Sequence, residues 1–393
     1  MRWRRRCANG WALRYDGRMS DDDFNAPEDE AADDGTAILP SPRENGELVG
    51  HAAAEAAFLR AYNAKRLPHA WLLAGPAGIG KATFAYRAAR FLLAQPEAGG
   101  GGGLFGDAAP PTALAIPSEH PVFRLVASGA HPDLLVVERA WDEKRKRLRS
   151  EIVVDDARAI AAFLHLTPSQ GAWRVVIVDG ADEMNRNAAN ALLKVLEEPP
   201  KRAVLFLTSE SPGRLLPTIR SRCRMLHMNI LPQESVLTAI QRFMPDLDGD
   251  DAAALAQLAG GSIGRALTLG AQDGLVVQRG LFGLLGGLPK LPGESLHAFA
   301  ETLVRGEAAG FGLLTDLLPR AVAAIAMLAL GREPAASPAE RAILARLAAR
   351  RSAAQWAELW RRLGQLFGAA EGVELDKRAV VLDAFFALAD AAR

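Results

Sequence analysis

A glycine-rich segment that ends in lysine is the part of this chain best suited to binding phosphate. Residues 75–82 are Gly-Pro-Ala-Gly-Ile-Gly-Lys-Ala. Glycine at Gly75, Gly78 and Gly80 lets backbone N–H groups turn inward around a phosphate, and a helix that begins here adds partial positive charge. In loops of this type the lysine, here Lys81, reaches the β and γ phosphates. A tight turn between strand and helix is the simpler interpretation, but the spacing and the lysine favour ancestry as a nucleotide loop.

The residue that follows the lysine is not suited to metal-assisted chemistry. Phosphate loops of this kind normally continue with serine or threonine, whose hydroxyl binds magnesium. Here the position holds Ala82, and a methyl group cannot bind a metal ion. Thr83 is one residue later, which on a helix turns its hydroxyl by about 100° away from that position. The sequence therefore predicts at most weak binding of ATP or ADP.

A second acidic motif lacks a catalytic group in the same way. Asp179 follows the apolar run at residues 175–178, where an aspartate would help to hold magnesium. The next position, which would orient the attacking water, holds Gly180 and can do no acid–base work. Asp182 and Glu183 follow, and we expect them to satisfy free N–H groups at a helix start. With two motifs impaired, we expect negligible ATP hydrolysis at this site.

Alternating apolar strands and helices must position these residues. Buried-type strands are expected at residues 69–74, 134–137, 175–178 and 203–208, with an edge strand at 225–228. Helices are expected at residues 48–65, 81–94, 152–166, 187–196 and 215–219, and an extended segment before residue 134. This order predicts an α/β fold, a P-loop domain with a mostly parallel sheet, followed by helical domains.

The division into domains follows from the change of pattern along the chain. Residues 1–44 are polar and acidic and are expected to form a disordered tail, and residues 45–230 the P-loop domain. After Pro232 the pattern becomes helical, which predicts a small lid domain at 231–273 and a collar or oligomerisation domain at 274–393. Helices in the latter are expected around 295–305, 311–330, 338–350, 353–368 and 374–391. Met19 begins the acidic segment, so one hypothesis is that residues 1–18 are an upstream extension.

Composition limits the classes of protein that this chain can belong to. The formal net charge is zero, so no bulk electrostatic field holds the protein on DNA. Two cysteines, Cys7 and Cys223, cannot build a disulfide framework or a four-thiolate zinc site, which predicts a cytoplasmic protein. The most apolar stretch, residues 311–330, contains Asp316, Pro319 and Arg320. It therefore favours a packed pair of helices over a membrane span.

Four motifs in this order resemble the AAA+ clamp-loader subunits of bacteria. Residues 67–82 resemble their P-loop region, and residues 190–200, Asn-Ala-Leu-Leu-Lys-Val-Leu-Glu-Glu-Pro-Pro, are close to the helix after their second acidic motif. Residues 221–223, Ser-Arg-Cys, match a family motif, and residues 260–267, Gly-Gly-Ser-Ile-Gly-Arg-Ala-Leu, resemble the sensor-2 helix. The resemblance covers roughly residues 45–270. The impaired ATP motifs favour the delta-prime type over the gamma/tau type, which keeps an intact hydroxyl and an Asp-Glu pair.

The resemblance implies a role in a five-subunit ring with gamma/tau and delta subunits. Such a ring loads the sliding clamp onto primer–template DNA. The chain would then be part of the DNA polymerase III holoenzyme, and the nucleotidyltransferase activity of DNA-directed DNA polymerase would belong to it only by association. Many relatives carry a four-cysteine zinc element after the first P-loop helix. Residues 95–135 contain no cysteine, and His120 and His131 cannot replace four ligands, so we expect no zinc.

The resemblance also implies roles for single residues. Arg222, in the Ser-Arg-Cys motif, would be an arginine finger that acts in trans at a neighbouring subunit; a surface salt bridge is the alternative. Arg265 would contact nucleotide from the lid, or would only brace the lid against the first domain. Thr208 has the sensor-1 position or simply caps its strand. Cys223 is expected to be a buried packing residue rather than a reactive thiol.

Two further features are interpreted as structural. The charged run at residues 144–149 is expected to be a solvated hairpin, although it could bind phosphates. Asp133, in His-Pro-Asp, has no evident partner in the sequence, which favours turn chemistry. The alternatives to the finger role are an active AAA+ ATPase of the gamma/tau type and a pure scaffold in which Arg222 is idle.

Overall fold

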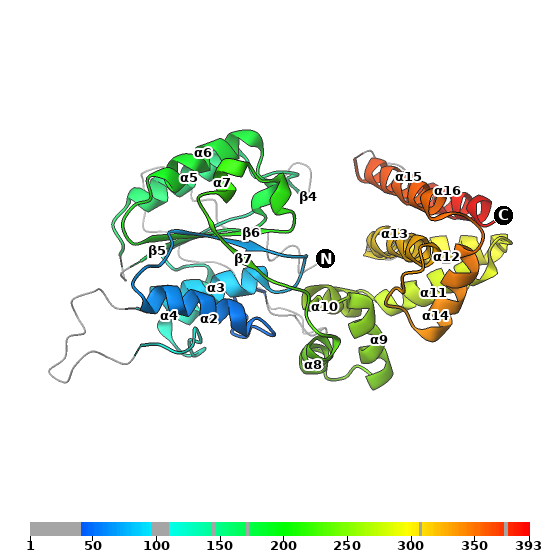
Figure 1. The fold of residues 1–393 in the computed structure, drawn as a ribbon, viewed down its shortest axis with the longest axis horizontal. Helices are drawn as coiled ribbons and strands as arrows, with labels where there is room; N and C mark the ends of the chain where they lie inside the picture. Colours follow the sequence, from blue (N-terminus) through cyan, green and yellow to red (C-terminus); the bar gives the residue numbers. More distant parts are fainter. Residues whose placement is uncertain (1–40, 96–109, 143–146, 170–172, 306–308, 373–375) are drawn as a thin grey trace, which may run out of the picture. The chain divides into compact units, whose positions relative to one another are not determined.

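A computed structural model describes residues 41–95, 110–142, 147–169, 173–305, 309–372 and 376–393 (Figure 1). These residues form two compact units, which meet in the sequence between Ile230 and Leu231. The named strands all belong to the first unit. The boundary therefore falls where the alternation of strands and helices ends in the sequence.

The first unit is built around a five-stranded sheet with the order β2-β5-β6-β1-β7, and all its pairings are parallel. Its strands are β1 (Ala70–Ala74), β2 (Leu134–Val137), β5 (Arg174–Val178), β6 (Ala203–Ser209) and β7 (Arg224–His227). The predicted parallel sheet and the edge position of β7 are thus confirmed. A separate antiparallel pair, β3 (Trp141–Asp142) and β4 (Arg147–Leu148), forms the predicted charged hairpin. Residues 143–146 of that hairpin lie outside the described residues.

Helices cover both faces of this sheet, which explains why its central strands are continuously apolar. On one face lie α2 (Ala52–Asn63), α3 (Lys81–Leu93) and α4 (Pro121–Ser128), and on the other α5 (Val154–His165), α6 (Arg186–Glu197) and α7 (Pro217–Arg220) (Figure 1). Successive strand residues alternate between the two cores. In β1, Trp71 and Leu73 pack on the α3 side, and Ala70 and Leu72 pack on the α6 side.

The connections place the ends of three strands together. After β1 the chain passes into α3, which lies on one face of the sheet. The strand beside β1 is β6, and the helix that precedes β6 is α6, which lies on the opposite face. Ala74 is aligned with Ser209, and Val178 with Leu207. In open α/β sheets, ligands bind outside the carboxyl ends of the strands where successive connections diverge in this way. The residues that follow β1, β5 and β6 therefore define the region in which to look for a site.

Two predictions for this unit need correction. The segment before β2, which was expected to be extended, contains helix α4, whose sequence has a proline at its first position and Gly129 at a φ of 76° after its last. Residues 41–44, placed in the tail by prediction, form a turn that is held on α3. Buried Arg90 donates to the carbonyls of Arg43 and Asn45 at 2.8 and 2.6 Å. Residues 1–40, and with them Cys7 and Met19, lie outside the described residues.

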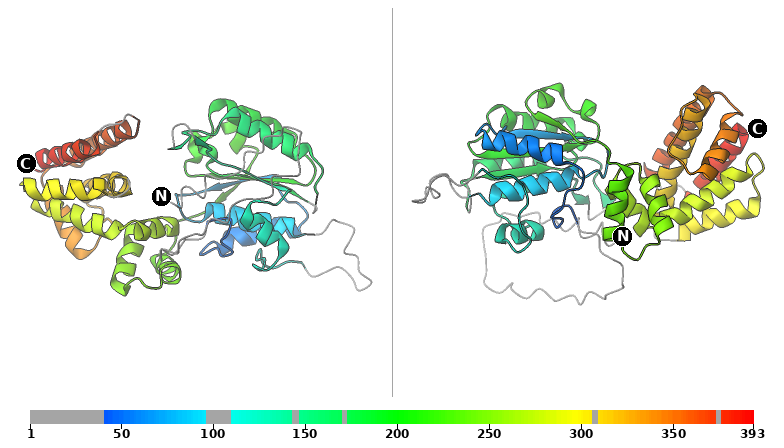
Figure 2. Two further views of the ribbon diagram at one scale, coloured as in Figure 1. Left: turned by 180° about the vertical axis from the view of Figure 1, so that it is seen from behind. Right: turned by 60° about the horizontal axis from the view of Figure 1, so that its bottom comes forward.

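The second unit is built of helices (Figure 2). Their apolar residues form one core. The helices are α8 (Gln233–Phe243), α9 (Gly249–Ala259), α10 (Ile263–Ala271), α11 (Gly274–Gly287), α12 (Gly293–Arg305), α13 (Ala309–Ala329), α14 (Pro338–Ala348), α15 (Ala353–Gly372) and α16 (Lys377–Ala391). Both predicted helical regions thus lie in one unit. Their assignment as lid and collar stays a prediction.

Helix α11 is absent from the prediction because glycine is unfavourable inside helices, by about 1 kcal/mol relative to alanine. Packing compensates here. Leu281 and Leu285 are fully buried, and at Gly280 an added Cβ would lie 2.5 Å from the ring of Phe299. The small residue therefore permits close packing between α11 and α12.

Helix α13 is one continuous helix with Pro319 inside it, not the packed pair of helices that the sequence favoured. Among the described residues, its segment 310–329 is the one helix long and apolar enough to cross a membrane, with a mean hydropathy of 1.6. Leu314, Leu318 and Val322 are fully buried in the core of the unit. The packing supports the interpretation of α13 as a core helix.

Candidate functional site

The phosphate loop connects β1 to α3, and its glycines are required by geometry. A Cβ at Gly75 would lie 2.2 Å from the carbonyl oxygen of Met228, so no larger residue fits there. Gly78 and Gly80 have φ angles of 68° and 105°, in the left-handed region that favours glycine. Helix α3 then begins at Lys81. The backbone therefore has the form that a phosphate-binding loop needs.

Buried His51, a residue that sequence reasoning missed, supports this loop from α2. Its Nε2 lies 2.7 Å from the carbonyl oxygen of Ile79, and burial lowers its pKa below the ordinary value. The imidazole is therefore neutral near pH 7, and its Nε2–H can donate to that carbonyl. His51 thus links the start of α2 to the loop.

Lys81 is turned back onto the loop. Its Nζ donates to the carbonyls of Gly75 and Pro76 at 2.8 and 2.6 Å, and the residue is only 7% exposed. Burial lowers its pKa, and the negative charges of Glu210, Asp179 and Asp182 oppose that shift. A phosphate on this loop would compete with the two carbonyls for the ammonium group. At the next position Ala82 carries only a methyl group, and Thr83 follows it within α3.

Asp179 and Thr208 meet at the carboxyl ends of β5 and β6. The hydroxyl of Thr208 donates to Oδ1 of Asp179 at 2.6 Å and accepts from the backbone N–H of Gly180 at 2.8 Å. Thr208 is 2% exposed. The hydroxyl therefore links β5 to β6. This is more than capping its own strand, which was the alternative to a sensor-1 role. Its sensor role stays a prediction.

The position after Asp179 could not easily accept a catalytic glutamate. Gly180 has φ 80°, and a Cβ added to it would lie 2.7 Å from Oε2 of Glu183. The same oxygen forms an ion pair with Nε of Arg139 at 2.8 Å. The pKa of Glu183 is raised, first by burial and then by Asp182 and other nearby carboxylates. Glu183 thus occupies the space beside Gly180.

Asp182 differs from its predicted role. It was expected to satisfy N–H groups at the start of its own helix. Instead its Oδ2 accepts from the backbone N–H groups of Glu210 and Ser211 at 3.2 and 2.9 Å, after strand β6. The side chain therefore fixes the loop after β6 against the end of β5, a contact between segments that the sequence places far apart.

The surroundings of Asp179 are acidic but do not form a metal centre. Burial, followed by the charge of Asp179, raises the pKa of Glu138 to about 6. Glu138 and Glu210 were not identified from the sequence. No group of three His, Cys, Asp or Glu side chains within the described ranges has the geometry to hold a metal ion. The site fits phosphate through its backbone, but with Ala82 and Gly180 it does not fit magnesium.

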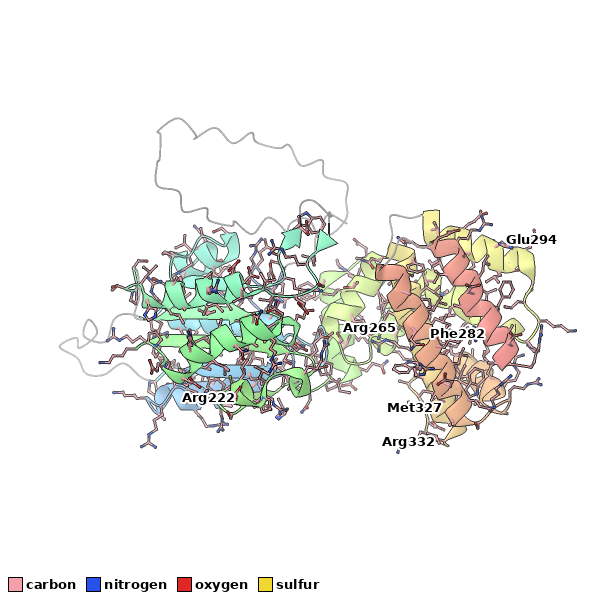
Figure 3. All side chains as sticks on the ribbon, turned by 90° about the horizontal axis from the view of Figure 1, so that it is seen from above. Arg222, Arg265, Phe282, Glu294, Met327 and Arg332 are labelled. Carbon is pink, nitrogen blue, oxygen red and sulfur yellow. The ribbon has the colours of Figure 1, made fainter. Side chains whose placement is uncertain are left out.

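Arg222 lies in the turn between α7 and β7, on the first unit (Figure 3). Its Nη1 donates to the carbonyl of Thr218 at 3.0 Å, and its Nη2 lies 2.9 Å from Oε1 of Glu197. The side chain is 35% exposed, so part of the guanidinium is accessible to solvent. The salt bridge named as the alternative to a finger is therefore present, and an exposed edge remains.

Cys223 follows Arg222 and packs against the core on the α6 side of the sheet. Burial raises the pKa of its thiol to about 12. Since the thiolate is the reactive form of cysteine, this shift disfavours a reactive role at neutral pH. The interpretation as a packing residue is supported.

Arg265 lies on α10 in the helical unit (Figure 3). Its Nη2 is 2.8 Å from Oδ2 of Asp316 on α13, and the same carboxylate also pairs with Arg320 at 2.8 Å. The side chain is 14% exposed, and burial lowers its pKa to about 10. Arg265 thus joins α10 to α13 inside its own unit. Its predicted contact with nucleotide stays a prediction.

The interpretation of Asp133 as a residue without a partner is wrong. Its fully buried carboxylate accepts from the backbone N–H of Ser169 at 2.9 Å and from the Ser169 hydroxyl at 3.2 Å, and lies 3.5 Å from Nη2 of Arg174. The partners follow Asp133 by about forty residues, which is why no local pattern revealed them. His131, next to it, is buried and uses its Nδ1 to accept from the N–H of Asp133. This network is structural and lies where β2 and β5 begin.

The sequence of this chain is similar to those of known DNA polymerase III subunits. Residues 50–232 match the family model described as DNA polymerase III, delta subunit. The DNA polymerase III subunit delta' of Pseudomonas aeruginosa is 40% identical over 195 residues, 49% of this chain and 53% of that protein. The subunit delta' of Escherichia coli is 33% identical over 214 residues, 54% and 57% of the two chains.

Two other similarities are more distant. The DNA polymerase III subunit tau of Escherichia coli is 27% identical over 256 residues, 63% of this chain and 36% of that protein. A solved structure of a gamma subunit-related protein from Thermotoga maritima is 19% identical and covers 86% of this chain and 99% of its own, with a TM-score of 0.38. A TM-score at that level does not establish a common arrangement of the whole chain. The chain spans about half the length of the curated delta' relatives it matches. Over about half of its length, the chain is therefore similar to delta' subunits of DNA polymerase III.

Proposed function

We propose that this chain is a delta-prime subunit of a DNA polymerase III clamp loader, and that it does not hydrolyse ATP itself. The observation that carries the proposal is a well-formed phosphate loop that lacks the metal-binding hydroxyl after its lysine, next to a strand end that lacks the glutamate that would orient water. Ala82 offers no metal ligand, and Gly180 is left-handed with Glu183 beside it. The loop holds ATP or ADP weakly at most, without magnesium. The match to the delta-subunit family model and the similarity to delta' subunits support the assignment to a clamp loader.

The proposed contribution of this subunit to catalysis is Arg222. A guanidinium stabilises the charge that develops on a phosphoryl group during transfer, and its planar fork suits phosphate better than a lysine does. The exposed part of Arg222 supports a role in trans at the ATPase site of a neighbouring subunit. The proposed partners are gamma/tau and delta subunits in a five-subunit ring, together with the sliding clamp and primer–template DNA.

The role is tested by reconstitution. Gamma/tau-type and delta-type subunits, sliding clamp, ATP and primed DNA are combined with and without this chain, and clamp retained on circular DNA is measured. We expect loading only when the chain is present, and background ATP turnover for the chain alone. Equal amounts of clamp on the DNA with and without this chain would contradict the proposed role. Turnover by the isolated chain that is abolished by Lys81→Ala would instead support an active ATPase of the gamma/tau type.

Restoring the two missing groups is not expected to restore hydrolysis. In the double variant Ala82→Thr with Gly180→Glu, residue 180 would need a left-handed backbone and would meet the carboxylate of Glu183. We therefore expect ATP turnover of the isolated variant to remain at background in a phosphate-release assay. The same variant with Glu183→Ala, which removes the obstructing carboxylate, is the matched comparison. Turnover by the double variant that still carries Glu183 would show that the backbone at residue 180 accepts glutamate easily. That result would contradict the expectation stated above.

A further inference from the structure

Arg222 is held between the ends of two helices. Glu197 is the last residue of α6, and its carboxylate lies 2.9 Å from Nη2 of Arg222. Thr218 belongs to the short helix α7, and its carbonyl accepts from Nη1 at 3.0 Å. A guanidinium is a rigid plane, so two contacts on different nitrogens determine its orientation. The contacts therefore select one direction for the exposed part of the side chain.

The identity of Glu197 is unfavourable for its own helix. The carboxyl end of a helix carries partial negative charge, and an acidic side chain in the last turn is destabilising there. Arg222 compensates this charge locally. An exposed ion pair of this kind contributes about 0–1 kcal/mol to stability, so stability alone gives little reason for the arrangement. An acidic side chain at the carboxyl end of a helix conflicts with the helix dipole, and such conflicts are expected where a residue serves a functional site.

The base from which Glu197 extends is rigid. Helix α6 is fixed to the sheet by Leu192, Val195 and Leu196, which are buried in the core on that face. Ile219 anchors α7 in the same core. Glu197 itself is 50% exposed and Arg222 is 35% exposed, so the pair lies at the surface on a well-packed support. Such a support can hold a side chain within the narrow range of positions that phosphoryl transfer requires.

We propose that Glu197 is a positioning residue for Arg222: its carboxylate holds the guanidinium in the orientation that acts on the neighbouring subunit's nucleotide. This inference rests on the proposed in-trans role of Arg222. Glu197 contacts neither nucleotide nor metal in this scheme. Without it, Arg222 keeps the contact with Thr218 but gains rotational freedom, and the fraction of time spent in the productive orientation falls.

The chain offers a matched control for this residue. Glu198 is the next residue, is also exposed, and lies just after α6. Replacing Glu197 or Glu198 by glutamine removes the same charge at neighbouring positions. Glu197→Asp keeps the charge and shortens the side chain. Because the side chain is half exposed, none of these changes disturbs the core.

The experiment measures ATP turnover of the reconstituted complex stimulated by clamp and primed DNA. We expect Glu197→Ala and Glu197→Gln to lower kcat about tenfold with KM within about twofold, since misorientation by a small distance can lower rates up to about 10². Glu197→Asp should recover part of the rate, and Glu198→Gln should match the wild type. In an Arg222→Ala complex, Glu197→Ala should have no further effect, because the two residues act through one group.

Different outcomes separate this inference from the proposed function. If Arg222→Ala slows the complex but every Glu197 variant is as fast as the wild type, Glu197 does not position the arginine and the inference is overturned alone. If Glu197→Ala accelerates turnover, the carboxylate restrains the finger, which also overturns it. If Arg222→Ala has no effect, the finger role fails, and the inference fails with it.

Discussion

Replacing Arg222 with alanine is expected to slow the ATP turnover of the assembled, clamp- and DNA-stimulated complex at least tenfold. A complete arginine finger contributes about 10³–10⁵ to the rate of its own site. A loss of at least tenfold for the whole complex follows when its ATPase sites turn over in one coupled cycle, in which the slowed site limits the others. Assembly should be preserved. Arg222 is partly exposed, and its pair with Glu197 contributes about 1 kcal/mol at most to folding.

The measurement compares wild-type, Arg222→Ala and Arg222→Lys complexes, with complex formation checked by gel filtration. Arg222→Lys keeps the charge but loses the planar fork, so it should recover little of the rate. Arg214, an exposed arginine in the segment before α7, provides the control, and Arg214→Ala should leave turnover unchanged. An Arg222→Ala complex as fast as the wild type would show that this subunit is a scaffold.

Much of the first unit could be predicted because its signals are local. The apolar runs of β1, β5 and β6 are long enough to be buried on both faces, which specifies a covered parallel sheet. Glycines that need positive φ, such as Gly78 and Gly80, mark the loop directly. Asp179 follows β5, and Thr208 lies at the end of β6. Because these strands are parallel neighbours, the topology brings both residues to the carboxyl-terminal end of the sheet. Their hydrogen bond confirms that proximity.

The contacts that could not be predicted join segments that are distant in sequence. The pair of Glu197 and Arg222 depends on how α6 and α7 pack on the sheet, and no local spacing encodes it. The pair of Arg265 and Asp316 depends likewise on the packing of α10 against α13. Helix α11 was missed because its glycines are a local signal against helix, and tertiary packing outweighs it.

Gly180 shows a limit of a different kind. The sequence revealed that the catalytic carboxylate is missing, but not that Glu183 lies beside the vacant position. The same residue also pairs with Arg139. A glutamate at position 180 would therefore meet the Glu183 carboxylate and would need a left-handed backbone, which no local pattern in the sequence indicated.

Asp133→Ala is expected to lower the free energy of unfolding by about 3–5 kcal/mol, the range for breaking a buried ion pair from one side. The carboxylate is fully buried, and Arg174 is 5% exposed, so the arginine would keep its charge without a counter-charge. Its contacts with the carbonyl of Phe163 at 3.0 Å and with the ring of Phe163 remain, and these moderate the loss. The N–H and hydroxyl of Ser169 lose their acceptor as well.

Urea unfolding of the isolated chain, followed by circular dichroism, measures this change. Asp155→Ala is the control, because Asp155 pairs with Arg158 at the surface, where the side chains are 80% and 72% exposed, and should cost less than about 1 kcal/mol. A loss below about 1 kcal/mol for Asp133→Ala would show that this network is dispensable. Asp133 directly precedes β2, whereas Arg222 precedes β7, the strand at the opposite edge of the sheet. At a temperature where the variant stays folded, its complex should therefore keep the turnover that depends on Arg222, because the buried network and the arginine lie at opposite edges of the sheet.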